Sequence, residues 1–198
     1  EKIYRPDPIL DLLKKLGDRH EQSYLNHLRS ERRVVAELPK FGDPSGEQTR
    51  EAIQSGADVI AQASLIDLPW RGFADFLIKV DRPSDLGDWS YEVVDTKLSY
   101  TTKATAVLQL SLYSEIVTNI QGVQPEWMHV VKPGDPFEVD SLRLDDYMAY
   151  FRMVKRQYEE SMAGEPDVTS KPEPCSHCEI CDWWPKCNQQ WRDVDHLG

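Results

Sequence analysis

An acid and a base stand close together in the apolar stretch YEVVDTKLSY, residues 91–100. Val93 and Val94 are β-branched and favour a strand, and side chains alternate between the two faces of a strand. Asp95 and Lys97 are therefore expected on the same face. Because burying an unpaired carboxylate or ammonium is costly, the two side chains must pair or serve a site. For an isolated D-x-K triplet, a salt bridge at a strand end is the simplest interpretation.

A second carboxylate lies inside another apolar stretch. Asp75 belongs to WRGFADFLIKV, residues 70–80, which also predicts a strand; alternatively, Asp75 is a turn or edge residue. Two carboxylates on adjacent strands with a lysine nearby suit hard cations such as Mg²⁺ or Mn²⁺. Such a cation polarises a phosphodiester and lowers the pKa of a bound water, while the lysine orients that water or stabilises negative charge. The pattern therefore indicates a metal-dependent phosphodiesterase site.

The clearest helix of the sequence follows, over residues 101–122. A threonine near its start is expected to cap it and Gly122 to end it. Gln109 and Tyr113 are four residues apart and share one helical face, where they can hydrogen-bond a DNA phosphate or Lys97. Without the preceding strand, Tyr113 would be interpreted as a core residue and Gln109 as a surface residue.

The stretches GFADFLIKV, YEVVDTK and LQLSLYSEI, in this order, resemble the RecB-like branch of the PD-(D/E)xK nucleases. The resemblance implies that Asp75 is the first metal-binding aspartate and that Asp95 and Lys97 form the D-x-K pair. It also implies that Gln109 and Tyr113 are the Q-x-x-x-Y motif of that branch. The cofactor implied is Mg²⁺ or Mn²⁺.

The resemblance extends upstream to His20 in GDRHEQSYL, within the first long predicted helix. It implies that His20 is a further ligand of the catalytic cation. A lone histidine on a helix is more often a surface or core residue, and Glu21 and His27 are nearby competitors for the role.

The four cysteines are confined to CSHCEICDWWPKC and are spaced C-x2-C-x2-C-x5-C. This clustering favours metal ligation in a reducing compartment over a disulfide framework. Four thiolates suit zinc or an iron–sulfur cluster, although the last spacing departs from the ferredoxin run. The predicted ligands are Cys175, Cys178, Cys181 and Cys187.

The last three cysteines resemble the C-x2-C-x5-C ending of iron–sulfur RecB-like nucleases, such as the AddB type and the nucleases of CRISPR adaptation. This implies a [4Fe–4S] cluster, with Zn²⁺ as the alternative. In those proteins the fourth cysteine lies upstream of the nuclease motifs, whereas this sequence has no cysteine before Cys175. Either Cys175 or a cysteine outside this chain is then the fourth ligand.

The composition sets the frame for these motifs. The chain has 198 residues, 40% of them hydrophobic, and a net charge of -11, which allows one domain with an appendage. The negative net charge argues against a broadly basic surface for nucleic acid. A cation site that gathers carboxylates, however, also makes the net charge more negative. The sequence has no apolar run long enough for a bilayer and no visible signal peptide, so we expect a cytoplasmic protein without a membrane partner.

The elements that must position these residues can be read from periodicity. The expected order is a helix over 9–31, a strand over 34–39, a helix over 47–56, strands over 58–66, 70–80 and 91–100, a helix over 101–122, a strand over 126–132 and a helix over 144–164. This order predicts a mixed α/β domain. The resemblance implies a restriction-endonuclease-like core with a central mixed sheet flanked by helices, over 1–164. Residues 165–198 are expected to be a cysteine segment packed on that core.

The leading hypothesis is a divalent-metal-dependent DNA nuclease that acts as an exonuclease or on single strands or duplex ends in DNA repair, with a helicase domain or subunit as a further partner. The alternative is a catalytically inactive nuclease-fold module that binds DNA or a partner within a larger repair protein. A small redox protein is a third hypothesis, which rests on the cysteines alone.

Overall fold

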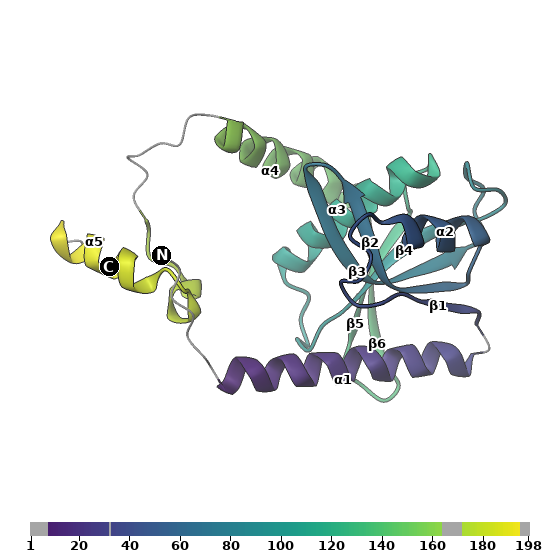
Figure 1. Ribbon diagram of the computed structural model, residues 1–198, viewed down its shortest axis with the longest axis horizontal. Coiled ribbons are helices and arrows are strands. Elements are labelled where there is room, and N and C mark those ends of the chain that lie inside the picture. The colour runs from purple at the N-terminus through teal and green to yellow at the C-terminus, as the bar shows by residue number, and fades with distance from the viewer. Residues whose placement is uncertain (1–7, 32, 164–171, 195–198) are drawn as a thin grey trace.

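The computed structural model describes residues 8–31, 33–163 and 172–194 (Figure 1). The elements are α1 (Pro8–Ser30), β1 (Val35–Glu37), α2 (Glu47–Ser55), β2 (Val59–Asp67), β3 (Trp70–Val80), β4 (Ser90–Thr96), α3 (Ala104–Gln121), β5 (Trp127–Lys132), β6 (Glu138–Arg143), α4 (Asp145–Ala163), η1 (Ser176–Ile180) and α5 (Trp184–Asp193). The predicted mixed α/β class is confirmed.

Six strands form one mixed sheet, in which their spatial order is also their chain order. β2, β3 and β4 pair antiparallel, as do β5 and β6. The parallel pairs are β1 with β2 and β4 with β5, and each of these pairs is connected by a helix, α2 or α3. This agrees with the need of parallel strands for a crossover connection.

The two faces of the sheet bury separate hydrophobic clusters. Leu25 and Leu28 of α1 pack with Phe76 and Val94 on one face. On the other face, α2, α3 and α4 supply the side chains that pack on the sheet. Figure 1 shows α1 running along one side of the sheet, opposite α3. The central strands of the sheet, β3, β4 and β5, therefore lie between α1 and α3.

The two ends of α3 differ in how well the sequence predicts them. Gly122 ends the helix as expected, with a φ of 70° and its N–H donating to the Thr118 carbonyl. The expectation of a threonine cap is wrong: the N-cap is Lys103, which makes no side-chain capping bond. The Thr102 hydroxyl instead donates to Asp140 of β6, 2.5 Å away, so it is used to fix the loop to the sheet.

Strand β6 is absent from the sequence prediction. Its segment, EVDSLR, contains only two apolar residues, and Val139 is 44% exposed. An edge strand with both faces partly solvated gives no clear hydrophobic pattern. The strand is tied to β5 through Lys132, whose Nζ lies 2.9 Å from Glu138 and 2.8 Å from Asp140.

Cys175 caps the start of η1, Cys178 lies on η1, Cys181 follows it and Cys187 lies on α5. Trp191 of α5 packs against Trp184 with a centroid distance of 5.6 Å and donates to the Pro172 carbonyl. Figure 1 draws this segment beyond the end of α4. The connection over 164–171 lies outside the described residues, so the predicted domain boundary and the packing of the segment on the core stay predictions. Within the described ranges, no helix is long and apolar enough to cross a membrane.

Candidate active site

The candidate site lies where β3 and β4 separate. Their pairing runs from Val80 opposite Ser90 to Phe76 opposite Val94 and stops there. At the next position, the Asp75 carboxylate accepts hydrogen bonds from the Thr96 backbone N–H and hydroxyl, each 2.7 Å long. The carboxylate thus replaces a ladder bond at the point where the strands diverge, and this fixes Asp75 next to the end of β4.

Asp75 also lies opposite an unusual residue of β2. Gln62 lies between the paired positions Ala61–Phe76 and Ala63–Ala74 and has a φ of 60°, which costs free energy for a residue other than glycine. Ala61 belongs to the cluster under α1 and Ala63 to the cluster under α3. In both strands, residues two positions apart thus face opposite sides of the sheet, so the regular alternation of side chains between its two faces is interrupted at this position. No feature of the sequence indicates this, because glutamine is not a typical residue for positive φ.

Asp95 is the most buried acid of the site, with only 2% of its surface exposed. Burial, followed by the negative charge of Asp75, raises the pKa of Asp95 to about 7, against the opposing effect of Lys97. Lys97 forms an ion pair with Asp95 Oδ2, yet this buried oxygen has no hydrogen bond of normal geometry from a described residue. A buried carboxylate whose ionisation is disfavoured by a second acid beside it is an arrangement that a cation would stabilise.

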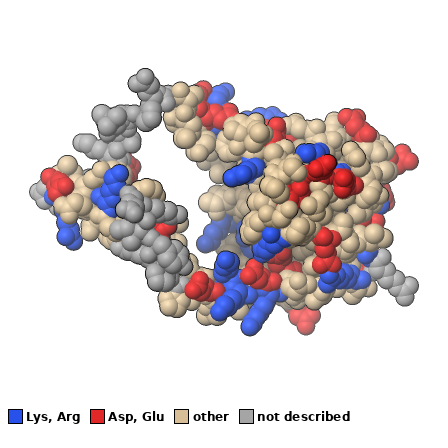
Figure 2. All heavy atoms as spheres, in the orientation of Figure 1, with Lys and Arg blue, Asp and Glu red and all other residues tan. Residues whose placement is uncertain are grey.

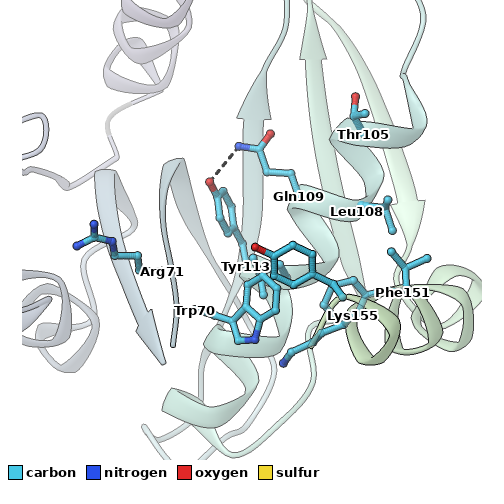
Figure 3. Close-up of a pocket in the computed structure, with 11 residues that line it drawn as sticks. Trp70, Arg71, Thr105, Leu108, Gln109, Tyr113, Phe151 and Lys155 are labelled. Carbon is cyan, nitrogen blue, oxygen red and sulfur yellow. Dashed lines mark hydrogen bonds between the residues drawn. The ribbon is translucent and has the colours of Figure 1, made fainter. Parts of the chain in front are cut away.

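Lys97 leads from the carboxylates to α3. Its Nζ lies 3.4 Å from Gln109 Oε1, and Gln109 Nε2 donates to the Tyr113 hydroxyl at 3.0 Å. Figure 3 shows the second of these bonds as a dashed line. The sequence predicts that Gln109 and Tyr113 hydrogen-bond either a DNA phosphate or Lys97, and in the structure Gln109 contacts Lys97. Tyr113 is at the same time a core residue, 7% exposed, with only its hydroxyl end directed to the site.

Tyr113 approaches β3 closely because residue 72 is a glycine. A Cβ atom at Gly72 would lie 2.2 Å from Tyr113 Cε1, far inside the contact distance of two carbon atoms. The backbone of β3 and the tyrosine ring thus occupy space that any side chain at position 72 would fill. Gly72 therefore contributes to the position of Gln109 through Tyr113.

The structure separates the roles of His20 and Glu21 on α1. His20 Nε2 lies 3.1 Å from the Val131 carbonyl oxygen, which also accepts the Lys97 backbone N–H. With that nitrogen committed to a carbonyl, only Nδ1 of His20 is left to bind a cation, and its ligand role stays a prediction.

Glu21 of α1 is electrostatically coupled to Asp75. Burial and then the charge of Asp75 raise the pKa of Glu21, while Lys40 lowers it. Lys40 Nζ is 3.3 Å from the Glu21 carboxylate, and Gln62 donates a hydrogen bond to the same group. Glu21 is therefore coupled to the site, although the sequence pattern indicates it only as a competitor of His20.

The candidate site offers two carboxylates, those of Asp75 and Asp95, as potential ligands of a cation. Across 8–31, 33–163 and 172–194, no three His, Cys, Asp or Glu side chains converge closely enough to hold a metal ion. Mg²⁺, however, usually keeps several water ligands and is bound by one or two carboxylates together with substrate phosphates. Asp75 and Asp95 fit that description.

The cysteine segment brings thiols together locally. Cys175 Sγ and Cys178 Sγ are 3.8 Å apart, and all four cysteines are free thiols. The Cys175 backbone N–H lowers the pKa of the Cys178 thiol, but partial desolvation and the thiols of Cys175 and Cys181 outweigh it and raise that pKa. Over 172–194, however, no three of the predicted thiol ligands converge closely enough to hold a metal ion, so the four-cysteine centre stays a prediction.

Comparison with known proteins adds no assignment. No protein-family model matches the chain, and no curated protein is significantly similar to it. The functional conclusion therefore rests on the geometry of the site.

Proposed function

We propose that this protein is a divalent-metal-dependent DNA nuclease of the RecB-like, PD-(D/E)xK type. The observation that carries the proposal is the meeting of Asp75, Asp95 and Lys97 at the point where β3 and β4 separate. A mixed sheet between α1 and α3 is compatible with a restriction-endonuclease-like core, and that fold is part of the proposal.

Asp75 and Asp95 would hold Mg²⁺ or Mn²⁺, with His20 or Glu21 of α1 as a further ligand. When bound, the cation would polarise the scissile phosphate and lower the pKa of the attacking water. The Asp75 carboxylate is oriented by its two bonds from Thr96. Asp95 and Gln109 hold the Lys97 ammonium from two sides, where it would stabilise the negative charge that develops on the phosphate.

The substrate we propose is a single strand or the end of a DNA duplex, in the cytoplasm and in DNA repair, with a helicase domain or subunit as partner. Figure 2 shows Lys and Arg side chains, interspersed with Asp and Glu, over the first half of α1, the helix that carries His20 and Glu21. Although the net charge is -11, basic groups near the site support contact with a phosphate backbone. The four cysteines form no disulfide with one another, which is compatible with a reducing compartment.

For the cysteine segment we propose a structural metal centre. Two thiolates on one tetrahedral zinc, each about 2.3 Å from the metal, stand about 3.8 Å apart, which is the separation of Cys175 and Cys178. The thiolates of a [4Fe–4S] cluster bind different irons and stand farther apart. The spacing of this pair is compatible with zinc, which is the alternative to the iron–sulfur cluster that the sequence resemblance implies.

A cleavage assay on linear and circular DNA with a series of divalent metals tests the nuclease. Wild-type protein should degrade linear DNA with Mg²⁺ or Mn²⁺, whereas Asp95→Asn and Lys97→Met should lose at least about 100-fold in rate. Asp81→Asn, which changes an exposed acid after β3, is the matched control and should keep the wild-type rate. DNA binding without cleavage in any metal would indicate the inactive module instead.

A further inference from the structure

A groove of about 390 Å³ opens beside the candidate site, between the start of β3 and the helices α3 and α4 (Figure 3). Gln109 and Tyr113 line this groove and also form the chain of hydrogen bonds that ends at Lys97. The groove is therefore connected to the proposed catalytic residues through Gln109 and Tyr113.

Aromatic side chains form one wall of the groove. Trp70 and Tyr158 face each other with a centroid distance of 5.4 Å. Trp70 Nε1 donates to Glu159 Oε1 at 2.7 Å, which fixes the indole against α4. Figure 3 shows the Trp70 ring next to Lys155 and below Tyr113. Tyr158 is 53% exposed, so a large part of the phenol surface is available for a ligand.

Two cations lie near the groove, Lys155 against the Trp70 ring and Arg71 at the next position of β3. Lys155 Nζ lies 5.6 Å from the Trp70 ring centroid and is paired with Glu115 of α3. Arg71 is exposed, and it forms no ion pair with another residue of the described part of the chain. Figure 3 shows Arg71 extending away from the aromatic residues. The apolar surface of the aromatic rings is complementary to a planar base, and the guanidinium of Arg71, which points away from the rings, is placed to meet a phosphate farther along the same strand of DNA.

We propose that this groove binds an unpaired nucleotide of the strand being cut, with its base on Tyr158 and Trp70 and a backbone phosphate at Arg71. The proposal rests on the proposed nuclease function and makes it selective for single strands. In a duplex the base faces are covered by stacked neighbours, so only an unpaired base offers its face to an aromatic side chain. Stacking of this kind does not depend on sequence, because every base has a flat face.

The test is a fluorescence-anisotropy titration in EDTA with a labelled oligothymidylate and with a blunt DNA hairpin. Tyr158→Ala should weaken oligothymidylate binding about tenfold and leave hairpin binding unchanged. Tyr150→Ala is the matched control, since Tyr150 is also on α4 and 58% exposed but does not line the groove. Arg71→Gln should weaken oligothymidylate binding as well and make it less dependent on salt.

The outcomes separate this proposal from the nuclease function. Equal affinities of Tyr158→Ala and Tyr150→Ala for oligothymidylate would overturn the proposal that the groove binds a base, even if the protein cleaves DNA with Mg²⁺. A loss confined to Tyr158→Ala and Arg71→Gln would support the groove, even if no metal supports cleavage. A loss of hairpin binding as large as that of oligothymidylate binding would contradict selectivity for the unpaired base. Thermal unfolding of each variant confirms that it is folded.

Discussion

Thr96 gives the Asp75 carboxylate two hydrogen bonds, one from its backbone N–H and one from its hydroxyl, each 2.7 Å long. The two residues are 21 positions apart in the chain and come from neighbouring strands. Both bonds end on the same oxygen, Oδ2, which leaves Oδ1 for another partner. The threonine between Asp95 and Lys97 is thus part of the site, although the D-x-K pattern leaves its identity open.

Thr96→Val removes the hydroxyl bond and keeps the shape of the side chain. We expect cleavage to fall at least about tenfold, because loss of a group that orients a metal-binding carboxylate typically has this effect. The free energy of unfolding should fall by about 1–2 kcal/mol. Thr118→Val is the control: its hydroxyl bonds the Ser114 carbonyl within α3, and cleavage should not change. A wild-type cleavage rate in Thr96→Val would contradict the role of this hydroxyl.

Asp95 should make the metal-free protein less stable as the pH rises. Its pKa is about 7 in the folded chain and about 3.9 in an unfolded one. The protonated acid is therefore favoured by folding, and its contribution is full below about pH 4 and lost as the pH rises through about 7. The raised pKa of Glu21 acts in the same direction. In EDTA at pH 8, Asp95→Asn should melt at least about 3 °C above the wild type.

Thermal melts of both proteins between pH 5 and pH 9 check this prediction. The gap between them should be smallest at the acid end, where wild-type Asp95 is protonated. Added Mg²⁺ should raise the melting temperature of the wild type more than that of Asp95→Asn, because only the wild type keeps both carboxylates. A gap that does not change with pH would contradict the raised pKa of Asp95.

Gly72→Ala should disturb the site through Tyr113. The new methyl group would overlap the tyrosine ring, and overpacking of this kind costs about 1–3 kcal/mol of stability. Displacement of the ring should also weaken the bond from Gln109 and lower the cleavage rate. Gly17→Ala is the control, since a Cβ there meets no atom within 4 Å and alanine favours the helix.

Urea unfolding of the single and double variants checks the contact. If the ring is the obstacle, Gly72→Ala should cost less stability in a Tyr113→Leu background than in the wild type. Costs that add independently in the double variant would show that Gly72 and Tyr113 do not interact.

A comparison of Glu21→Gln with His20→Gln decides which residue of α1 helps to hold the cation. Because Glu21 is coupled to Asp75 while His20 Nε2 meets a backbone carbonyl, Glu21→Gln should weaken Mn²⁺ binding more, by about tenfold. Calorimetric titration with Mn²⁺ measures both affinities. A larger loss in His20→Gln would assign the ligand to the histidine, as the sequence resemblance implies.

Metal analysis of the purified protein tests the cysteine segment. We expect one zinc ion for each chain and no visible absorption, and Cys178→Ser should lose most of the metal. Asp193→Ala, on the same segment but without a thiol, should retain it. Brown protein that contains iron would assign the segment to an iron–sulfur cluster instead.

The sequence by itself determines which residues share a face. The period of a strand predicts Asp95 and Lys97 on one face, and the two residues form an ion pair, although β4 ends at Thr96 and Lys97 directly follows it. The period of a helix puts Gln109 and Tyr113 together on α3, where they share a hydrogen bond. Such relations follow from local backbone geometry, which each segment has wherever it packs.

Only the tertiary structure decides which of these faces meet. The contact of Asp75 with Thr96 depends on where β3 and β4 separate. Beside the groove, a hydrogen bond joins Trp70 to Glu159, which lies 89 positions later in the chain. The choice between His20 and Glu21 depends on how α1 is rotated against the sheet. β6 forms because β5 offers it an edge rather than because its own sequence favours a strand. These relations depend on register and helix orientation, which are set by packing over the whole chain and which local periodicity leaves open.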